Sequence, residues 1–212
     1  MKRLLQFVIA LSLCVAVASP AFAQEEASPW RLGVHAGAAY SNLNGDVLTS
    51  SDATWGPYAG ATAEYFFANS FSVGFEANYL QKGNKKGLIG NTEFEMSLKY
   101  VEIPLILNGY YAFNENWLGS LYAGLAMALK VSCDVRINDD PQSDCAQSGL
   151  TGEAESMEWS VPLGGGVVYK FPGKNSLLRL DVRYSIGLSD VVKTLNVTTR
   201  TWEFILGYGF GI

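Results

Sequence analysis

After its first 23 residues the sequence has no apolar run of the ~20 residues that a transmembrane helix needs. This absence excludes a helical membrane protein. Positive charge is also scarce, because 15 Lys and Arg stand against 20 Asp and Glu, for a net charge of −5. That balance argues against a nucleic-acid partner, which requires a basic surface. What the chain does have is 49% hydrophobic residues, with 22 Gly, 11 Tyr and 11 Phe, a composition suited to strands.

The N-terminus has the layout of a secretory signal peptide. Lys2 and Arg3 form a basic start, residues 4–18 are apolar, and Ala21-Phe22-Ala23 is a small-x-small cleavage site. The apolar stretch is short for a membrane span. We therefore predict that residues 1–23 are removed and that residues 24–212 form a single exported domain with a net charge near −7, and we expect no further domain after its last strand.

Cysteine is rare, and removal of the signal peptide leaves two, Cys133 and Cys145. In an exported protein a pair this close predicts a local disulfide, worth ~3 kcal/mol on the loop-entropy model. The segment between them is acidic but lacks the glycine turn of known calcium loops, which favours a solvated loop over a cation site. Its aspartates are Asp134, Asp139, Asp140 and Asp144.

Apolar and polar residues alternate one by one along most of the chain, a pattern typical of β-strands with two different faces. In LLRLDVRYSIGL (residues 177–188) three charges stand at every second position of an apolar run. Similar segments start at Trp30, Tyr58, Phe71, Trp117, Met157 and Trp202, and residues 94–111 add an eighth strand. In that segment the polar phase shifts, which predicts a β-bulge near Tyr100–Val101.

The predicted strands are joined by links that are alternately long and short. Up-and-down transmembrane barrels show this alternation, with short periplasmic turns and longer outside loops. A soluble lipocalin-like barrel is the alternative, but its exterior is seldom as rich in glycine as the polar face here. Aromatic residues near the strand ends fit interfacial girdles: Trp30, Tyr40, Tyr79, Trp117, Trp159, Phe171 and Trp202. We predict an all-β fold, an eight-stranded antiparallel up-and-down transmembrane β-barrel.

The segment YVEIPLILNGYY (Tyr100–Tyr111) resembles the fourth strand of the PorT-like outer-membrane β-barrel (porin) family of Bacteroidetes-type bacteria. LGVHAGAAYSNL, LYAGLAMALK, LGGGVVYKF, VRYSIGLSDV and FILGYGFGI are also similar to it, so the resemblance covers residues 30–212. It implies an eight-stranded barrel in the outer membrane and, for a few members, a role in protein secretion. The sequence departs from the family at Ile212, where a terminal aromatic residue is usual.

Assigning the two faces places eleven charged residues in the barrel interior. An eight-stranded barrel is just wide enough for side chains to fill it, and buried charges must be paired. We therefore expect a charge network that plugs the lumen, with a small-solute porin as the alternative. The predicted network is Arg31, Glu64, Glu76, Glu102, Lys130, Glu158, Lys170, Arg179, Asp181, Arg183 and Glu203.

The single histidine, His35, falls on the interior face of the first strand. Lipid-cleaving barrels need their nucleophile and base on the membrane side, so we interpret His35 as an interior hydrogen-bonding residue. We expect no enzymatic activity, no cofactor and no metal site. Lys82, Lys85 and Lys86 are placed in an outside loop, where they could hold lipopolysaccharide phosphates.

These observations predict an outer-membrane protein with a structural or surface-interaction role. The expected partners are outer-membrane lipid and lipopolysaccharide, the barrel-assembly machinery during biogenesis, and an extracellular protein that contacts the 133–155 loop. An accessory role in protein secretion is a further alternative, resting on the family resemblance alone.

Overall fold

A computed structural model describes residues 29–45, 49–89, 92–138, 143–144, 155–190 and 197–212. The described part consists of nine strands: β1 Trp30–Gly45, β2 Ser50–Ala68, β3 Phe71–Ile89, β4 Thr92–Ala112, β5 Trp117–Ile137, β6 Ser143–Asp144, β7 Met157–Lys170, β8 Ser176–Gly187 and β9 Val197–Gly211. The predicted signal peptide lies outside the described residues. No helix in the described part is long and apolar enough to cross a membrane.

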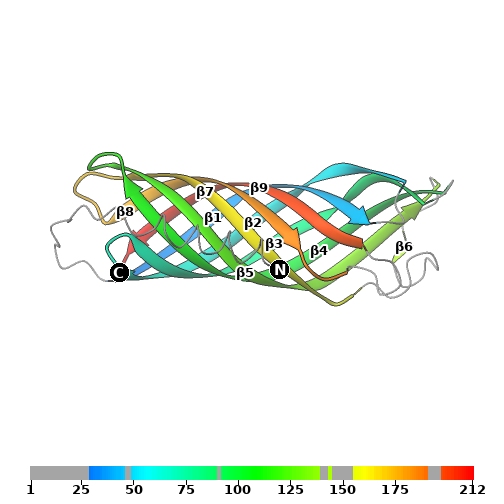
Figure 1. The fold of residues 1–212 in the computed structure, drawn as a ribbon, viewed down its shortest axis with the longest axis horizontal. Helices are drawn as coiled ribbons and strands as arrows, with labels where there is room; N and C mark the ends of the chain where they lie inside the picture. Colours follow the sequence, from blue (N-terminus) through cyan, green and yellow to red (C-terminus); the bar gives the residue numbers. More distant parts are fainter. Residues whose placement is uncertain (1–28, 46–48, 90–91, 139–142, 145–154, 191–196) are drawn as a thin grey trace, which may run out of the picture.

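Eight of the strands close into an antiparallel ring, as the alternation predicted (Figure 1). Each long strand pairs with its neighbour in the chain, and β1 pairs with β9 to complete the barrel. The two-residue β6 adds to β5 beyond the point where β7 begins. Closure leaves no open edge along the wall, which a bilayer demands because lipid cannot hydrogen-bond free backbone groups.

The outer face of the wall is apolar between two aromatic girdles. In β8 the outward side chains include Leu178, Leu180 and Val182, and Leu180 is 56% exposed. Trp55, Tyr40, Trp202 and Tyr184 are register neighbours on four consecutive strands, and two pairs of their rings lie 4.8 Å and 4.6 Å apart. Other outward aromatics, such as Trp30 with Tyr65 and Trp117 with Tyr169, pair at the end that carries the short turns.

The distance between the girdles matches a bilayer. Trp30 to Tyr40 on β1 covers 11 residues. On β5, residues 117–127 connect the two levels, because Met127 opposes the girdle residue Trp159. A transmembrane strand needs about 9–11 residues. Strands β2 to β5 have 19 to 21 residues, so they continue well beyond the upper girdle. In barrels of this class the short turns face the periplasm, so this extension is extracellular.

In the extension the two faces exchange polarity. The inside holds an apolar cluster that includes Leu43, Phe94, Met96, Leu98 and Val135, all buried. The outside carries ion pairs between neighbouring strands, with N–O distances of 2.8–3.5 Å: Lys86–Glu93, Arg136–Glu95 and Lys99–Asp134. Water surrounds this part of the barrel, so its apolar residues are sequestered inside as in a soluble protein.

A register shift does occur at the level of the bulge predicted near Tyr100–Val101, but the extra residue is not on β4. Residues of β4 keep one phase from Phe94 to Asn108, with every even-numbered side chain directed inward. The register shift lies on β5, where Val131 is an extra residue between the partners of Lys99 and Tyr100. The charges that suggested a phase break, Glu95 and Lys99, face outward in the extension. At the membrane boundary the surroundings of β4 change from lipid to water, while its alternation of inward and outward side chains continues unchanged.

Two segments expected to be long loops are largely strand. Residues 41–45 belong to β1, residues 50–56 to β2, and residues 82–89 to β3. Lys85 and Lys86 are exposed as expected. Lys82 is not, because its side chain points into the lumen and is fully buried. The prediction that Lys82 lies in an outside loop is therefore wrong.

The predicted disulfide stays a prediction, because Cys145 lies outside the described residues. Cys133 is buried on β5. The register of β5 with β6 sets Asp134 opposite Asp144, so the residue after Cys133 lies beside the residue before Cys145. That pairing favours the bridge. Asp139 and Asp140 also lie outside the described part, so the acidic loop remains a sequence prediction.

Candidate functional site: the charged lumen

The centre of the lumen is organised by Arg183 of β8, which is 4% exposed. Its Nη1 and Nη2 atoms donate to the two carboxylate oxygens of Glu76 at 2.9 Å and 2.8 Å, a bidentate pair. Nη1 also donates to the Tyr58 hydroxyl at 3.0 Å and lies 3.7 Å from Glu203 Oε2. The guanidinium stands 5.3 Å from the centre of the Tyr122 ring. One buried cation therefore ties together strands β2, β3, β5, β8 and β9.

Toward the extracellular side a second group forms around Lys82. Its Nζ donates to Glu102 of β4 at 3.3 Å and to Glu158 of β7 at 3.2 Å. Glu158 also accepts a hydrogen bond from Thr199 of β9. The ammonium lies 5.4 Å from the centre of the Tyr100 ring. All of these side chains are buried, directly beneath the apolar cluster of the extension.

The periplasmic half contains a third group. Arg179 donates to Asp181 through Nε at 3.0 Å and Nη2 at 3.3 Å, and through Nη1 to the Tyr110 hydroxyl at 3.2 Å. Tyr110 in turn donates to Glu64, which also accepts from Arg31 at 3.4 Å. Below this group a small apolar cluster of Leu118, Val168 and Leu177 packs between the walls.

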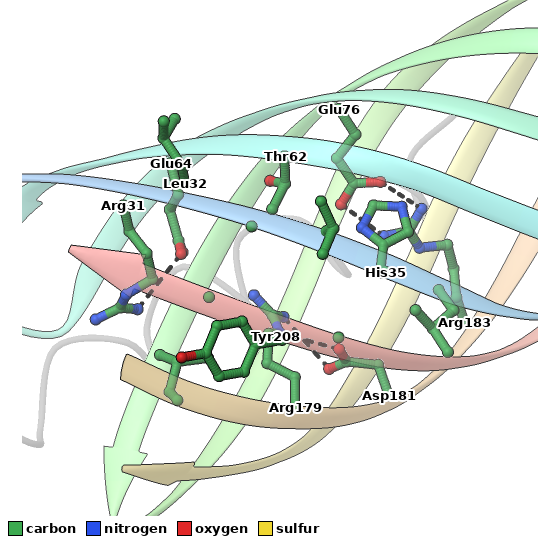
Figure 2. Close-up of a pocket in the computed structure, with 16 residues that line it drawn as sticks. Arg31, Leu32, His35, Thr62, Glu64, Glu76, Arg179, Asp181, Arg183 and Tyr208 are labelled. Atoms are coloured by element: carbon green, nitrogen blue, oxygen red, sulfur yellow. Dashed lines mark hydrogen bonds and ion pairs between the residues drawn. The ribbon is translucent and has the colours of Figure 1, made fainter. Parts of the chain in front are cut away.

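His35 lies between the second and third groups, on the lumen side of β1. Its Nε2 donates to Asn78 Oδ1 at 2.7 Å, and its ring stacks on the Tyr58 ring with 5.5 Å between the ring centres. Asn78 donates onward to Glu76 at 2.9 Å. Figure 2 shows His35 and Arg183 next to Glu76, with Arg179 and Asp181 farther along β8, the strand that carries Arg183. Within the described residues His35 is held as a member of a hydrogen-bonded network.

The residues shown in Figure 2 enclose a cavity of about 30 Å³. A single water needs roughly 10–15 Å³ by the same measure, so the cavity has room for very few water molecules. Gly60 shows how tightly this region is packed, because a Cβ there would lie 2.2 Å from Asn78 Oδ1 and 2.7 Å from His35 Nε2. Glycine on the inner face is what allows His35 and Asn78 to meet.

The structure places nine of the eleven residues predicted for the interior in these three groups. Lys130, opposite Tyr100, and Lys170, at the end of β7, are half-buried, each with contacts of its own. Lys82 is the member that the sequence analysis missed. Continuing the alternation of Ser72, Gly74, Glu76 and Asn78 by two steps would have found it. Three tyrosines also join the network: Tyr58, Tyr110 and Tyr122. The alternation sets each on the polar face of its strand, but the prediction of the network was limited to charged residues.

The architecture of a closed eight-stranded wall with an apolar exterior is also the pattern of a known family. The family model of the outer membrane protein beta-barrel domain matches residues 22–193. The chain belongs to this family. Its place is therefore the bacterial outer membrane, where the apolar band between the girdles meets lipid. No curated protein matches the chain.

Solved structures of outer-membrane barrels share the fold of this family member. Neisserial surface protein A is 16% identical, with a TM-score of 0.51, and the match covers 89% of this chain and all of that one. The outer membrane protein OprG from Pseudomonas aeruginosa is 12% identical, with a TM-score of 0.55, and the match covers 88% of this chain and 97% of that one. At these identities the similarity describes the fold alone.

Proposed function

We propose that this outer-membrane barrel is a non-conducting surface protein that acts through its extracellular extension. The observation that carries the proposal is the number of large side chains that point into the lumen and are buried there. Three ion-pair groups follow one another along the barrel, and apolar clusters lie above and below them. A hydrated solute would have to break the Arg183–Glu76 pair and displace buried tyrosines to pass. The small cavity beside His35 supports the same conclusion.

The second support is the length of the strands. Beyond the upper girdle β3, β4 and β5 present a wall of alternating charges, held by cross-strand pairs of 2.8–3.5 Å. A rigid, charged wall with an apolar interior is suited to holding loops in fixed positions above the membrane. Among these, the 133–155 loop is our proposed contact with an extracellular protein. Lys85, which is exposed on the same wall, is our proposed contact with lipopolysaccharide phosphates.

Reconstitution in a planar bilayer tests the closed lumen. We expect the refolded protein to give no discrete conductance steps, because in our proposal the buried ion-pair groups and apolar clusters occupy the lumen. Folding is verified in the same sample by the shift in electrophoretic mobility between unheated and heated protein. Discrete steps from folded protein would instead establish a small-solute porin.

Replacement of the loop tests the surface role. We expect a variant with residues 138–155 exchanged for a Gly/Ser linker of the same length to fold and insert normally, since β4, β5 and β7 keep their register below. Cross-linking on intact cells from a surface position such as Glu93 should trap an extracellular partner with the natural chain and not with the variant. Equal cross-linking in both would show that the loop is not the contact surface.

We also propose the finer assignment to the PorT-like family. The segment that carries this resemblance lies on β4 and turns Tyr100, Glu102 and Pro104 inward. Glu102 is a partner of Lys82. The residues of the resemblance therefore contribute to closing the lumen, which supports a structural role for the segment and leaves an accessory role in secretion resting on the resemblance. We further propose that the protein is not an enzyme, since its only histidine is bonded inside the lumen.

A further inference from the structure

Three buried glutamates lie at the level of the extracellular girdle. They are Glu102 of β4, Glu158 of β7 and Glu203 of β9, and each is at most 2% exposed. Trp159 and Trp202, the chain neighbours of Glu158 and Glu203, point outward in the girdle. The glutamates therefore stand near the outer boundary of the membrane, inside the wall.

These carboxylates outnumber the cations that reach them. Lys82 is shared by Glu102 and Glu158. Arg183 directs its bidentate pair to Glu76 and stands 3.7 Å from Glu203. In the ion pairs within 4 Å, four buried carboxylates, those of Glu76, Glu102, Glu158 and Glu203, thus share Lys82 and Arg183. The groups around them, strand by strand, are His35 of β1, Tyr58 of β2, Glu76 and Lys82 of β3, Tyr100 of β4, Tyr122 and the half-buried Lys130 of β5, Glu158 of β7, Asp181 and Arg183 of β8, and Glu203 of β9.

Several polar atoms in this region are buried without a hydrogen-bond partner. They include one oxygen of each glutamate and two hydroxyl oxygens: Glu102 Oε1, Glu158 Oε2, Glu203 Oε2, Ser160 Oγ and Thr201 Oγ1. A buried carboxylate oxygen without a partner is strongly unfavourable, and a group in this position takes up a counter-charge or loses its own charge.

The geometry decides which positive species fits. The described residues contain no group of three acidic, histidine or cysteine side chains arranged to hold a metal ion. The cavity beside His35 is lined by none of the three glutamates. A proton needs no additional volume, and it turns an orphaned carboxylate oxygen into a donor.

We propose that the lumen binds a proton at Glu203, and that this proton makes the closed lumen sensitive to external pH. Among the three, Glu203 has the weakest compensation. It accepts from Ser185 at 2.9 Å, while its other oxygen has only the distant Arg183. Raising the pH removes the proton and leaves excess negative charge buried. The packed lumen is therefore most stable at acidic pH and becomes less stable toward alkaline pH. The inference concerns the lumen and does not require the surface role proposed above.

Infrared spectroscopy of the refolded full chain in lipid tests this directly. At neutral pH we expect an absorption band from a protonated carboxyl group, lost in Glu203→Gln. The control Glu93→Gln removes an exposed carboxylate of the outer wall and should leave the band unchanged. Absence of the band in the natural chain, or its persistence in Glu203→Gln, would overturn the proposal.

Unfolding by urea gives a second measurement. The midpoint for the natural chain should fall from mildly acidic to mildly alkaline pH, and the midpoint for Glu203→Gln should stay level over that range, because glutamine mimics the protonated acid. A midpoint that falls equally in both chains contradicts the assignment to Glu203. Neither measurement depends on the bilayer recording. Conductance steps would therefore contradict the proposed function without contradicting the proton on Glu203.

Discussion

Replacing Arg183 with methionine should destabilise the barrel by about 3–5 kcal/mol, the usual effect of removing one partner from a buried ion pair. Methionine has a similar length and fills much of the same space, so the loss is mainly electrostatic. Glu76 would lose both bonds of its bidentate pair, and Glu203 its nearest cation. Urea unfolding in detergent micelles, followed by tryptophan fluorescence, measures the effect.

Two further variants separate this effect from a general loss of packing. Lys174→Met, on the exposed turn between β7 and β8, should change the stability by less than about 0.5 kcal/mol. Adding Glu76→Gln to Arg183→Met should recover part of the loss, because the double variant no longer buries the Glu76 charge. If Glu76→Gln lowered the stability of Arg183→Met as much as it lowers that of the natural chain, the two residues would not be coupled as the structure indicates.

The second large effect is expected on the lipid face. Leu121→Arg should cost about 2–4 kcal/mol and reduce insertion, because arginine near the middle of a bilayer is strongly unfavourable. Leu121 points outward from β5 between the girdles and is 76% exposed. The measurement is reversible folding into lipid vesicles, with the folded fraction read from heat-modifiable electrophoresis.

Val131→Arg on the same strand is the matched control. Val131 also faces outward and is 63% exposed, but it lies in the extension above the girdle, where water replaces lipid. We expect a change of less than about 1 kcal/mol there. Equal losses at both positions would contradict the proposed membrane boundary, since the two outward-facing positions lie at different levels along the wall.

The alternation in the sequence predicted the inward and outward side chains correctly where lipid surrounds the barrel. In LLRLDVRYSIGL the alternation predicted that Arg179, Asp181 and Arg183 face the lumen, and β8 has that arrangement. The same assignment of polar residues to the inside failed above the extracellular girdle, where Met96 and Leu98 of β4 point inward and Glu95 points outward. The same pattern has opposite meanings on the two sides of a membrane boundary, and a sequence does not mark where that boundary lies.

The partners inside the lumen were equally hidden. The sequence predicted a set of charges of both signs, but Lys82 bridges residues 20 and 76 positions away along the chain. Arg183 meets Glu76 across 107 residues. Such pairings depend on how far each strand is staggered against the next, and this stagger accumulates around the whole ring.

By itself the sequence determined that the chain forms strands with one apolar and one polar face, because the period of two and the glycine-rich polar face are local properties of each segment. Closure of the ring, and with it the environment of each side chain, belongs to the tertiary structure. Ring closure brings Glu76, Arg183 and Glu203 together from three strands, and the length of the strands beyond the girdle turns Phe94 and Leu98 into an interior lid. The meeting of these charges and the burial of these apolar residues both follow from the register between strands, which every residue of the wall helps to set.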